Sequence, residues 1–281
     1  MKQSKRKWSS PRLLVIPAAA ATAAAAIALT RQRNTSMKFE RLGAAALETL
    51  LNAIDANDPV TGGHVRRVAR YALVLADAMG ADEHAAHTIE RVALFHDIGK
   101  IHEALFDVIH DHRKLTPQER RAINTHAARG ATVLGPLASF YPELPKGVLA
   151  HHERWDGTGY PSELAGKAIP VAARVVAIAD TFDAITHTRR YRPGRSLEVG
   201  MTAIGEGRGT QFDPELVDLF MAPPIQDRIR EEMRGAGSLE HKPATHRRSH
   251  GGKRDPAPDV RFRWRETSPA DSGKNRVPRR T

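Results

Sequence analysis

The sequence of 281 residues contains no cysteine, and this absence excludes several kinds of chemistry. Without a thiol there is no disulfide framework, no thiolate metal site, no iron–sulfur cluster and no cysteine nucleophile. Any bound metal ion must therefore be held by histidine and carboxylate side chains, and the sequence supplies 14 histidines. The alternation of apolar and polar residues that is typical of β-strands is also scarce, and no internal repeat occurs.

The formal net charge of +11 is concentrated at the two ends of the chain. Residues 1–39 carry eight basic and no acidic side chains, and residues 236–281 carry twelve basic and five acidic ones. The segment 40–235 therefore has a net charge of −4. A mildly acidic core argues against a clamp for duplex DNA, so we expect no specific nucleic-acid partner. The basic ends are suited only to weak, salt-sensitive attachment to RNA, DNA or anionic lipid.

Residues 1–39 form a basic, alanine-rich N-terminal extension. Its apolar stretch, 13–29, has 17 residues and includes Pro17, whereas a spanning helix needs roughly 20 apolar residues. Three interpretations stay open: a membrane anchor, a cleaved signal peptide, and a mis-called start upstream of Met37. As an anchor, the more basic flank would place residues 40–281 outside the cytoplasm, against the function expected below. We therefore expect a cytoplasmic location, with membrane anchoring through this extension as the alternative.

Apolar residues recur at helical spacing from residue 38 to about residue 220, which predicts an all-α domain. The second predicted helix covers 61–79 and ends at Gly80, and the third begins at Asp82, a suitable N-cap residue. The first predicted helix carries one apolar stripe, formed by Leu42, Ala46, Leu50 and Ile54.

Prolines indicate where further helices begin. Thr116 and Pro117 are suited to the N-cap and the first position of a fourth helix. Residues 171–185 follow Pro170 and are rich in Ala, Val and Ile, which predicts a buried helix. The turn-rich segment 153–170 is expected to form an ordered loop of the kind that often carries function. Residues 226–281 are basic with few apolar side chains, so we expect a disordered C-terminal tail.

Histidines and aspartates recur in or at the ends of the predicted helices. Asp180 interrupts an apolar helix, where a lone carboxylate must pair, for example with Arg174, cap a helix or bind metal. Imidazole and carboxylate ligands without thiolate suit Fe, Mn, Zn or Ni. Five histidines and two aspartates exceed what one ion takes, so two ions sharing a bridging aspartate are the natural arrangement. The set consists of His64, His96, Asp97, His126, His151, His152 and Asp180.

Three longer strings resemble the HD-GYP family of metal-dependent phosphohydrolases, a branch of the HD superfamily. They are HDIGK (96–100), HHERWDGTGYP (151–161) and AIADTFDAITHTRRYRP (177–193), and flanking segments extend the resemblance over about 45–220. The resemblance implies an HD-superfamily helical bundle with a glycine-rich GYP loop, which we assign to residues 40–225. Many members of the family hydrolyse cyclic di-GMP.

The resemblance also implies a role for each member of the histidine and aspartate set. All seven would ligate two divalent metal ions, with iron or manganese favoured, and Asp97 would bridge them. One site would be completed by His64 and Asp180, and the other by His126, His151 and His152. Some members hold a third metal through a glutamate at the position of Val60, which cannot ligate, so a dinuclear site is implied.

Two cations generate hydroxide near neutral pH and stabilise the charge that develops on phosphoryl oxygens during hydrolysis. Lys100 would supply a further cation at the same phosphate, so Asp97 and Lys100 are the expected catalytic residues. Tyr160 either stacks on a guanine or supports its loop, and the basic segment 189–192 either holds the second phosphate or is a solvated turn. The expected substrate-binding residues are Lys100, Tyr160, Arg189, Tyr191 and Arg192.

The segment after HDIGK departs from the family pattern, because 101–113 lacks the usual proline-containing run. It contains three additional histidines, which are extra ligands or exposed loop residues: His102, His110 and His112. The sequence therefore favours a metal-dependent phosphodiesterase that acts on a cyclic dinucleotide, with cyclic di-GMP as the first choice. A broader phosphohydrolase acting on nucleotides or phosphate monoesters, and a catalytically silent nucleotide-sensing module, are the alternatives. The oligomeric state is unknown from the sequence.

Overall fold

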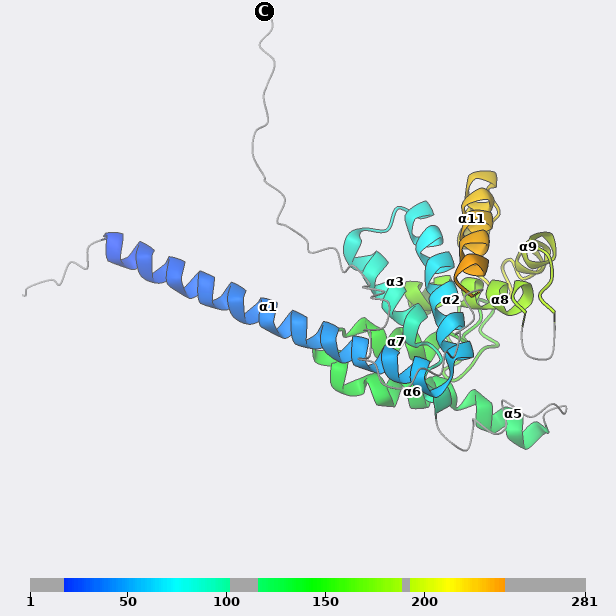
Figure 1. Ribbon diagram of the computed structural model, residues 1–281, viewed down its shortest axis with the longest axis horizontal. Helices are drawn as coiled ribbons and strands as arrows, with labels where there is room; N and C mark the ends of the chain where they lie inside the picture. The colour runs from blue at the N-terminus through cyan, green and yellow to red at the C-terminus, as the bar shows by residue number, and fades with distance from the viewer. Residues whose placement is uncertain (1–17, 102–115, 189–192, 241–281) are drawn as a thin grey trace, which may run out of the picture. The chain divides into compact units, whose positions relative to one another are not determined.

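A computed structural model describes residues 18–101, 116–188 and 193–240 (Figure 1). Within these ranges the chain forms helices and no strand, which confirms the expected all-α class. The helices are α1 (Ala18–Asn57), α2 (Pro59–Ala78), α3 (Glu83–Phe95), η1 (Ile98–Ile101), α5 (Pro117–Asn124), α6 (His126–Leu134), η2 (Gly135–Ser139), α7 (Glu143–Ala150), η3 (Gly166–Ala168), α8 (Val171–Thr186), α9 (Leu197–Glu206), α10 (Pro214–Phe220) and α11 (Pro223–Glu240).

Several helices begin where their capping residues predict. The Asp82 carboxylate caps α3 by accepting a hydrogen bond of 2.8 Å from the backbone N–H of Ala85. Helix α5 begins at Pro117, and α8 begins directly after Pro170. Helix α2 begins two residues before the predicted start, because Asp58 accepts a hydrogen bond from the N–H of Val60 and Pro59 occupies the first turn.

Helices α2 and α8 pack against each other at the centre of the fold, and α2 also contacts α1, α3, α10 and α11 (Figure 1). The predicted apolar face of α2 is buried, including Val65 and Leu75. Phe182 of α8 packs edge-to-face against Tyr71 of α2 and against Phe220 of α10. Because these two helices are fixed by the core, they are rigid supports for the polar side chains that they carry.

The helix predicted first is present as α1, and its predicted apolar stripe is confirmed at Leu50 and Ile54, which pack in the core, but is wrong at Leu42. The buried residues are Leu47, Leu51 and Ile54, whereas Leu42 is 62% exposed. Each step of four residues advances about 40° around a helix, so a row continued over three such steps turns by about 120°. The two ends of the predicted row therefore point in directions about 120° apart, and Leu42 faces solvent while Ile54 faces the core.

Both expected domain boundaries fall inside helices. Helix α1 continues through residue 39, and α11 continues past residue 225. The expectation of disorder is therefore wrong for residues 226–240, although it stays a prediction for 241–281, which lie outside the described residues. Helix α11 is stabilised by packing on α2: Ile229 is fully buried, and Arg228 forms an ion pair of 2.6 Å with Asp77.

In the described part of the chain, no helix has both the length and the apolar character needed to cross a membrane. Residues 1–17, which include the start of the alanine-rich stretch, lie outside that part. The three interpretations of the N-terminal extension therefore stay predictions.

Candidate metal centre

All seven predicted ligands lie within the described residues and converge from several helices. Helix α2 supplies His64, α6 begins with His126, and α8 supplies Asp180, while the other four follow the last turns of α3 and α7. Six of the seven form two groups of three in which the ligand atoms lie within 4.8 Å of one another. The first group is His64, His96 and Asp180, and the second group is His126, His151 and His152.

The ligand atoms of the first group are directed at one another, and its two histidines are buried. Oδ1 of Asp180 lies 3.2 Å from Nε2 of His64 and 3.9 Å from Nε2 of His96. The Nδ1–H of His96 donates to the backbone carbonyl of Ala93 over 2.8 Å. Nε2 of His96 is buried and has no hydrogen-bond partner within the described residues. An unsatisfied buried imidazole nitrogen is costly, and a metal ion is a partner that would satisfy it.

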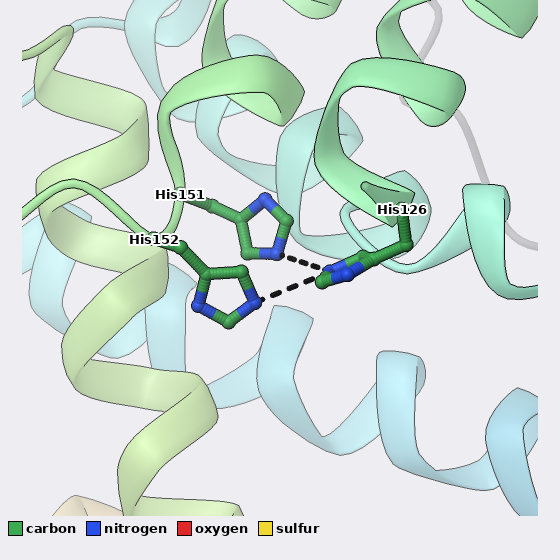
Figure 2. A group of neighbouring side chains, drawn as sticks. All are labelled: His126, His151 and His152. Carbon is green, nitrogen blue, oxygen red and sulfur yellow. Dashed lines mark hydrogen bonds between the residues drawn. The ribbon is translucent and has the colours of Figure 1, made fainter. Parts of the chain in front are cut away.

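Figure 2 shows the second group, in which three imidazole rings turn their Nε2 atoms toward one another. Nε2 of His126 lies 3.2 Å from Nε2 of His151 and 3.2 Å from Nε2 of His152 (Figure 2). The Nδ1–H groups of His126 and His151 donate to the backbone carbonyls of Ile123 and Val148 over 2.6 Å. In the neutral rings Nε2 therefore carries a lone pair. Lone pairs that approach this closely need a shared proton or a cation between them.

Asp97 lies between the two groups and directs one oxygen toward each. Its Oδ1 is 3.4 Å from Nε2 of His126 in the second group. Its Oδ2 is 3.5 Å from Nε2 of His96 and 3.8 Å from Nε2 of His64 in the first group. The Oδ1 atom is buried and has no hydrogen-bond partner in the described part of the chain. This placement fits a carboxylate shared by two cations.

Both carboxylates of the centre have a pKa below the usual value, which favours their ionised form. Burial raises the pKa of Asp97, but Lys100 and the surrounding histidines outweigh it and hold this pKa well below its usual value. The Nζ of Lys100 lies 2.6 Å from Oδ2 of Asp97. Burial likewise raises the pKa of Asp180. The hydrogen bond and positive charge of His64, together with the charge of His96, outweigh burial, so this pKa lies below its usual value. Both groups are thus in the form that binds cations.

The histidines differ in protonation between the two groups. Burial lowers the pKa of His126 and of His151, and it lowers the pKa of His152 to about 4 with a contribution from the charge of His126. The second group is therefore neutral near pH 7, as metal ligation requires. Burial also lowers the pKa of His64, but hydrogen bonds to Asp180 and Asp183 outweigh it and raise this pKa to about 9. A cation at the first group must displace this proton from Nε2.

Two buried residues of the centre, Asp183 and Arg67, are missed by the sequence interpretation. Oδ2 of Asp183 accepts a hydrogen bond of 2.7 Å from Nδ1 of His64. Arg67 donates to both oxygens of Asp183, over 2.8 Å from Nε and 3.1 Å from Nη2. The available signal is spacing: each of the two residues follows a predicted ligand by three positions, so it lies on the same helix face. Arg174, the suggested partner of Asp180, instead pairs with Asp213 at 2.5 Å.

Tyr160 lies against the metal centre through His152. Their rings stack with centroids 4.9 Å apart at an angle of 27°, and the Tyr160 N–H donates to the His152 carbonyl over 3.3 Å. The carboxylate of buried Glu153 closes the loop by accepting hydrogen bonds from the N–H groups of Ser162 and Leu164. This arrangement supports the loop-supporting alternative for Tyr160, and its contact with substrate stays a prediction.

The remaining predicted site residues lie outside the described residues. This applies to Arg189, Tyr191 and Arg192, and to the three histidines within 102–115. Val60, at the position where some family members have a glutamate ligand, is 59% exposed. No third group of three ligands occurs in the described ranges.

The structure is thus an all-α domain in which two neighbouring groups of candidate metal ligands are linked by Asp97. This arrangement is typical of helical proteins that bind two metal ions. The family model of the HD domain matches residues 48–216. The chain therefore belongs to the HD domain family, and the resemblance of its motifs to the HD-GYP branch is confirmed.

Curated relatives align with the same region. The 3'3'-cGAMP-specific phosphodiesterase 2 of Vibrio cholerae is 37% identical over 174 residues, which cover 61% of this chain and 33% of the relative. A probable cyclic di-GMP phosphodiesterase of the same organism is 32% identical over 201 residues, covering 66% and 45%. The cyclic di-GMP phosphodiesterase response regulator RpfG of Xanthomonas campestris is 34% identical over 199 residues, covering 70% and 52%. The chain thus spans between a third and about half of the length of these relatives.

Proposed function

We propose that this chain is a phosphodiesterase that hydrolyses a cyclic dinucleotide with two divalent metal ions, one at each group. The observation that carries the proposal is the placement of Asp97, whose oxygens face the two groups separately. Nε2 of His96 and Oδ1 of Asp97 are buried without a hydrogen-bond partner in the described residues, which supports cation binding at this position. Iron or manganese is favoured on the family resemblance, and imidazole and carboxylate ligands without thiolate suit these ions as well as Zn and Ni.

When bound, the two ions would supply a hydroxide near neutral pH and stabilise negative charge on the phosphoryl oxygens. The protein itself orients the ligands, because the Nδ1–H groups of His96, His126 and His151 are fixed by backbone carbonyls. Lys100 is 28% exposed and holds its ammonium beside Asp97, so it adds a positive charge at the edge of the centre. An anionic phosphodiester is attracted to this charge, which would become most useful as the phosphoryl oxygens gain charge.

Cyclic di-GMP is the proposed substrate of first choice, because two of the three relatives described above carry it in their names. The third is named for 3'3'-cGAMP, another cyclic dinucleotide. A cytoplasmic location, where such a nucleotide would be met, belongs to the same proposal.

The test uses the purified full chain loaded with Mn²⁺ or Fe²⁺. Metal content is measured first, followed by turnover of cyclic di-GMP, 3'3'-cGAMP and a panel of nucleotides and phosphate monoesters. We expect about two ions per chain and cleavage of a cyclic dinucleotide that Asp97→Ala abolishes. Metal binding with turnover of monoesters alone would replace the proposal by the broader phosphohydrolase. A folded chain that binds no metal would overturn both enzymatic functions.

A further inference from the structure

His64 differs from three other candidate ligand histidines in the partner of its Nδ1 atom. The Nδ1–H groups of His96, His126 and His151 each donate to a backbone carbonyl three residues earlier in the chain. The Nδ1 atom of His64 instead contacts a carboxylate, Oδ2 of Asp183, on another helix and at 2.7 Å. A carboxylate accepts hydrogen bonds only, so this nitrogen carries the proton.

Helix α8 holds the imidazole of His64 from both sides. Asp180 and Asp183 are one helical turn apart on α8, with Asp180 at 3.2 Å from Nε2 and Asp183 at 2.7 Å from Nδ1. A flip of the ring would exchange a nitrogen for a carbon at both contacts. The orientation of His64 is therefore set by two carboxylates of one rigid helix.

Arg67 keeps Asp183 in place. It lies one turn after His64 on α2 and donates two hydrogen bonds to the carboxylate, one to each oxygen. Asp183 is 1% exposed and Arg67 is also buried, so solvent does not substitute for either partner. A two-point arginine–carboxylate contact fixes the plane of the carboxylate as well as its position. Arg67 of α2 and the two aspartates of α8 thus form a closed arrangement around His64.

We propose that Asp183, held by Arg67, is a positioning residue that fixes His64 with its Nδ1 protonated and its Nε2 directed at the first group. Asp183 would thereby strengthen cation binding at the first group and leave the second group unaffected. The physical basis is the carboxylate–histidine–metal arrangement, in which the outer carboxylate fixes the tautomer and raises the basicity of the ligating nitrogen. The inference rests on the proposed function only in requiring that the two groups bind cations.

The variant Asp183→Asn tests the inference with little change of shape. Its neutral amide cannot accept all three hydrogen bonds that His64 and Arg67 donate to the carboxylate, because one of its two positions is an NH₂ donor. Asp213→Asn is the matched control, because Asp213 is equally buried and also pairs with an arginine, Arg174. Both variants remove a buried negative charge from an ion pair with arginine.

The readout is Mn²⁺ affinity of the full chain at each group separately, without substrate. Asp183→Asn is combined with His152→Ala, which removes a ligand of the second group, so that the affinity of the first group is measured. It is combined with His64→Ala, which removes a ligand of the first group, so that the affinity of the second group is measured. We expect Asp183→Asn to weaken Mn²⁺ binding about 10- to 100-fold in the His152→Ala background and to leave it unchanged in the His64→Ala background. Asp213→Asn should change neither.

Unchanged affinity at the first group, or an equal loss at both groups, would overturn the inference. Wild-type chain that binds Mn²⁺ without hydrolysing a cyclic dinucleotide would contradict the proposed function alone, since the affinities still decide the role of Asp183. Wild-type chain that binds no Mn²⁺ would overturn both.

A measurement on the wild-type chain covers the case in which Asp183→Asn does not fold. The ring nitrogens of His64 are observed by ¹⁵N NMR in the chain loaded with diamagnetic Zn²⁺, and a His64→Gln sample assigns the signals. We expect Nδ1 to keep its proton and Nε2 to show the shift of a metal-bound nitrogen. Metal coordination through Nδ1 would refute the positioning role.

Discussion

The glycine of the loop after His152 approaches the backbone so closely that no side chain fits at its position. A Cβ atom on Gly159 would lie 2.4 Å from the backbone N of Arg154 and 2.5 Å from Cα of Glu153. Ordinary contacts of a Cβ atom begin at about 3.4 Å. Since the atoms in conflict are backbone and cannot rotate away, Gly159→Ala must move the loop by about 1 Å.

This displacement acts on the metal centre through the next residue, because Tyr160 stacks on His152. A misplacement of about 1 Å costs on the order of 100-fold in catalysis, so we expect kcat/KM for the cyclic dinucleotide to fall by about that factor. Overpacking should also lower the free energy of unfolding by about 1–3 kcal/mol. The Nδ1 hydrogen bonds of His126 and His151 are not made by this loop, so bound metal should be retained.

The assay compares urea unfolding, metal content and turnover of Gly159→Ala with those of wild type. Gly135→Ala is the control, because a Cβ atom at Gly135 meets nothing within 4 Å. Its free energy of unfolding should stay within about 0.5 kcal/mol of wild type. A Gly159→Ala chain with wild-type stability and turnover would show that the close approach in the loop is not required.

Three further outcomes are expected. Lys100→Met keeps most of the aliphatic stem and loses the charge beside Asp97, so it should lower turnover about 100-fold with metal content unchanged. Loss of bound metal in this variant would instead show that Lys100 is needed to hold the metal ligands in place. Ile229→Ala should lower the free energy of unfolding by about 2–5 kcal/mol in urea titrations, whereas the exposed neighbour Glu231→Ala should stay within about 0.5 kcal/mol; equal effects would contradict the packing of α11. Removal of metal by a chelator should lower the melting temperature, and Mn²⁺ at 100 times its Kd should restore about 2.7 kcal/mol for each site; a melting temperature independent of Mn²⁺ would contradict metal binding by the native state.

The features that the sequence predicts best are those that depend on one residue and its immediate neighbours. Asp82 and Pro117 mark their helix starts because capping and the missing proline N–H act within one turn. The seven candidate ligands could be selected because five of them lie in strings long enough to be specific, and His64 and His126 lie in the segments that flank these strings. The convergence of the two groups is then a property of the packed helices, which the strings imply and the structure displays.

The features that the sequence does not reveal depend on partners distant along the chain. Asp183 follows Asp180 by one turn, but its role requires Arg67, which is 116 residues away. Helix α11 has a polar composition, and it is ordered because Ile229 and its neighbours pack on α2. A composition average cannot distinguish such a helix from a disordered tail, since two or three well-placed apolar residues decide the outcome.

The first group draws its ligands from segments more than 100 residues apart, with His64 on α2 and Asp180 on α8. A cation held there would act as a cross-link, in a chain that has no cysteine to form one. For comparison, a covalent bridge that closes a loop of 100 residues removes about 4.7 kcal/mol of unfolded-chain entropy. A metal ion that closes a loop of similar length would act in the same direction, so depletion of the ion would weaken the fold as well as the chemistry.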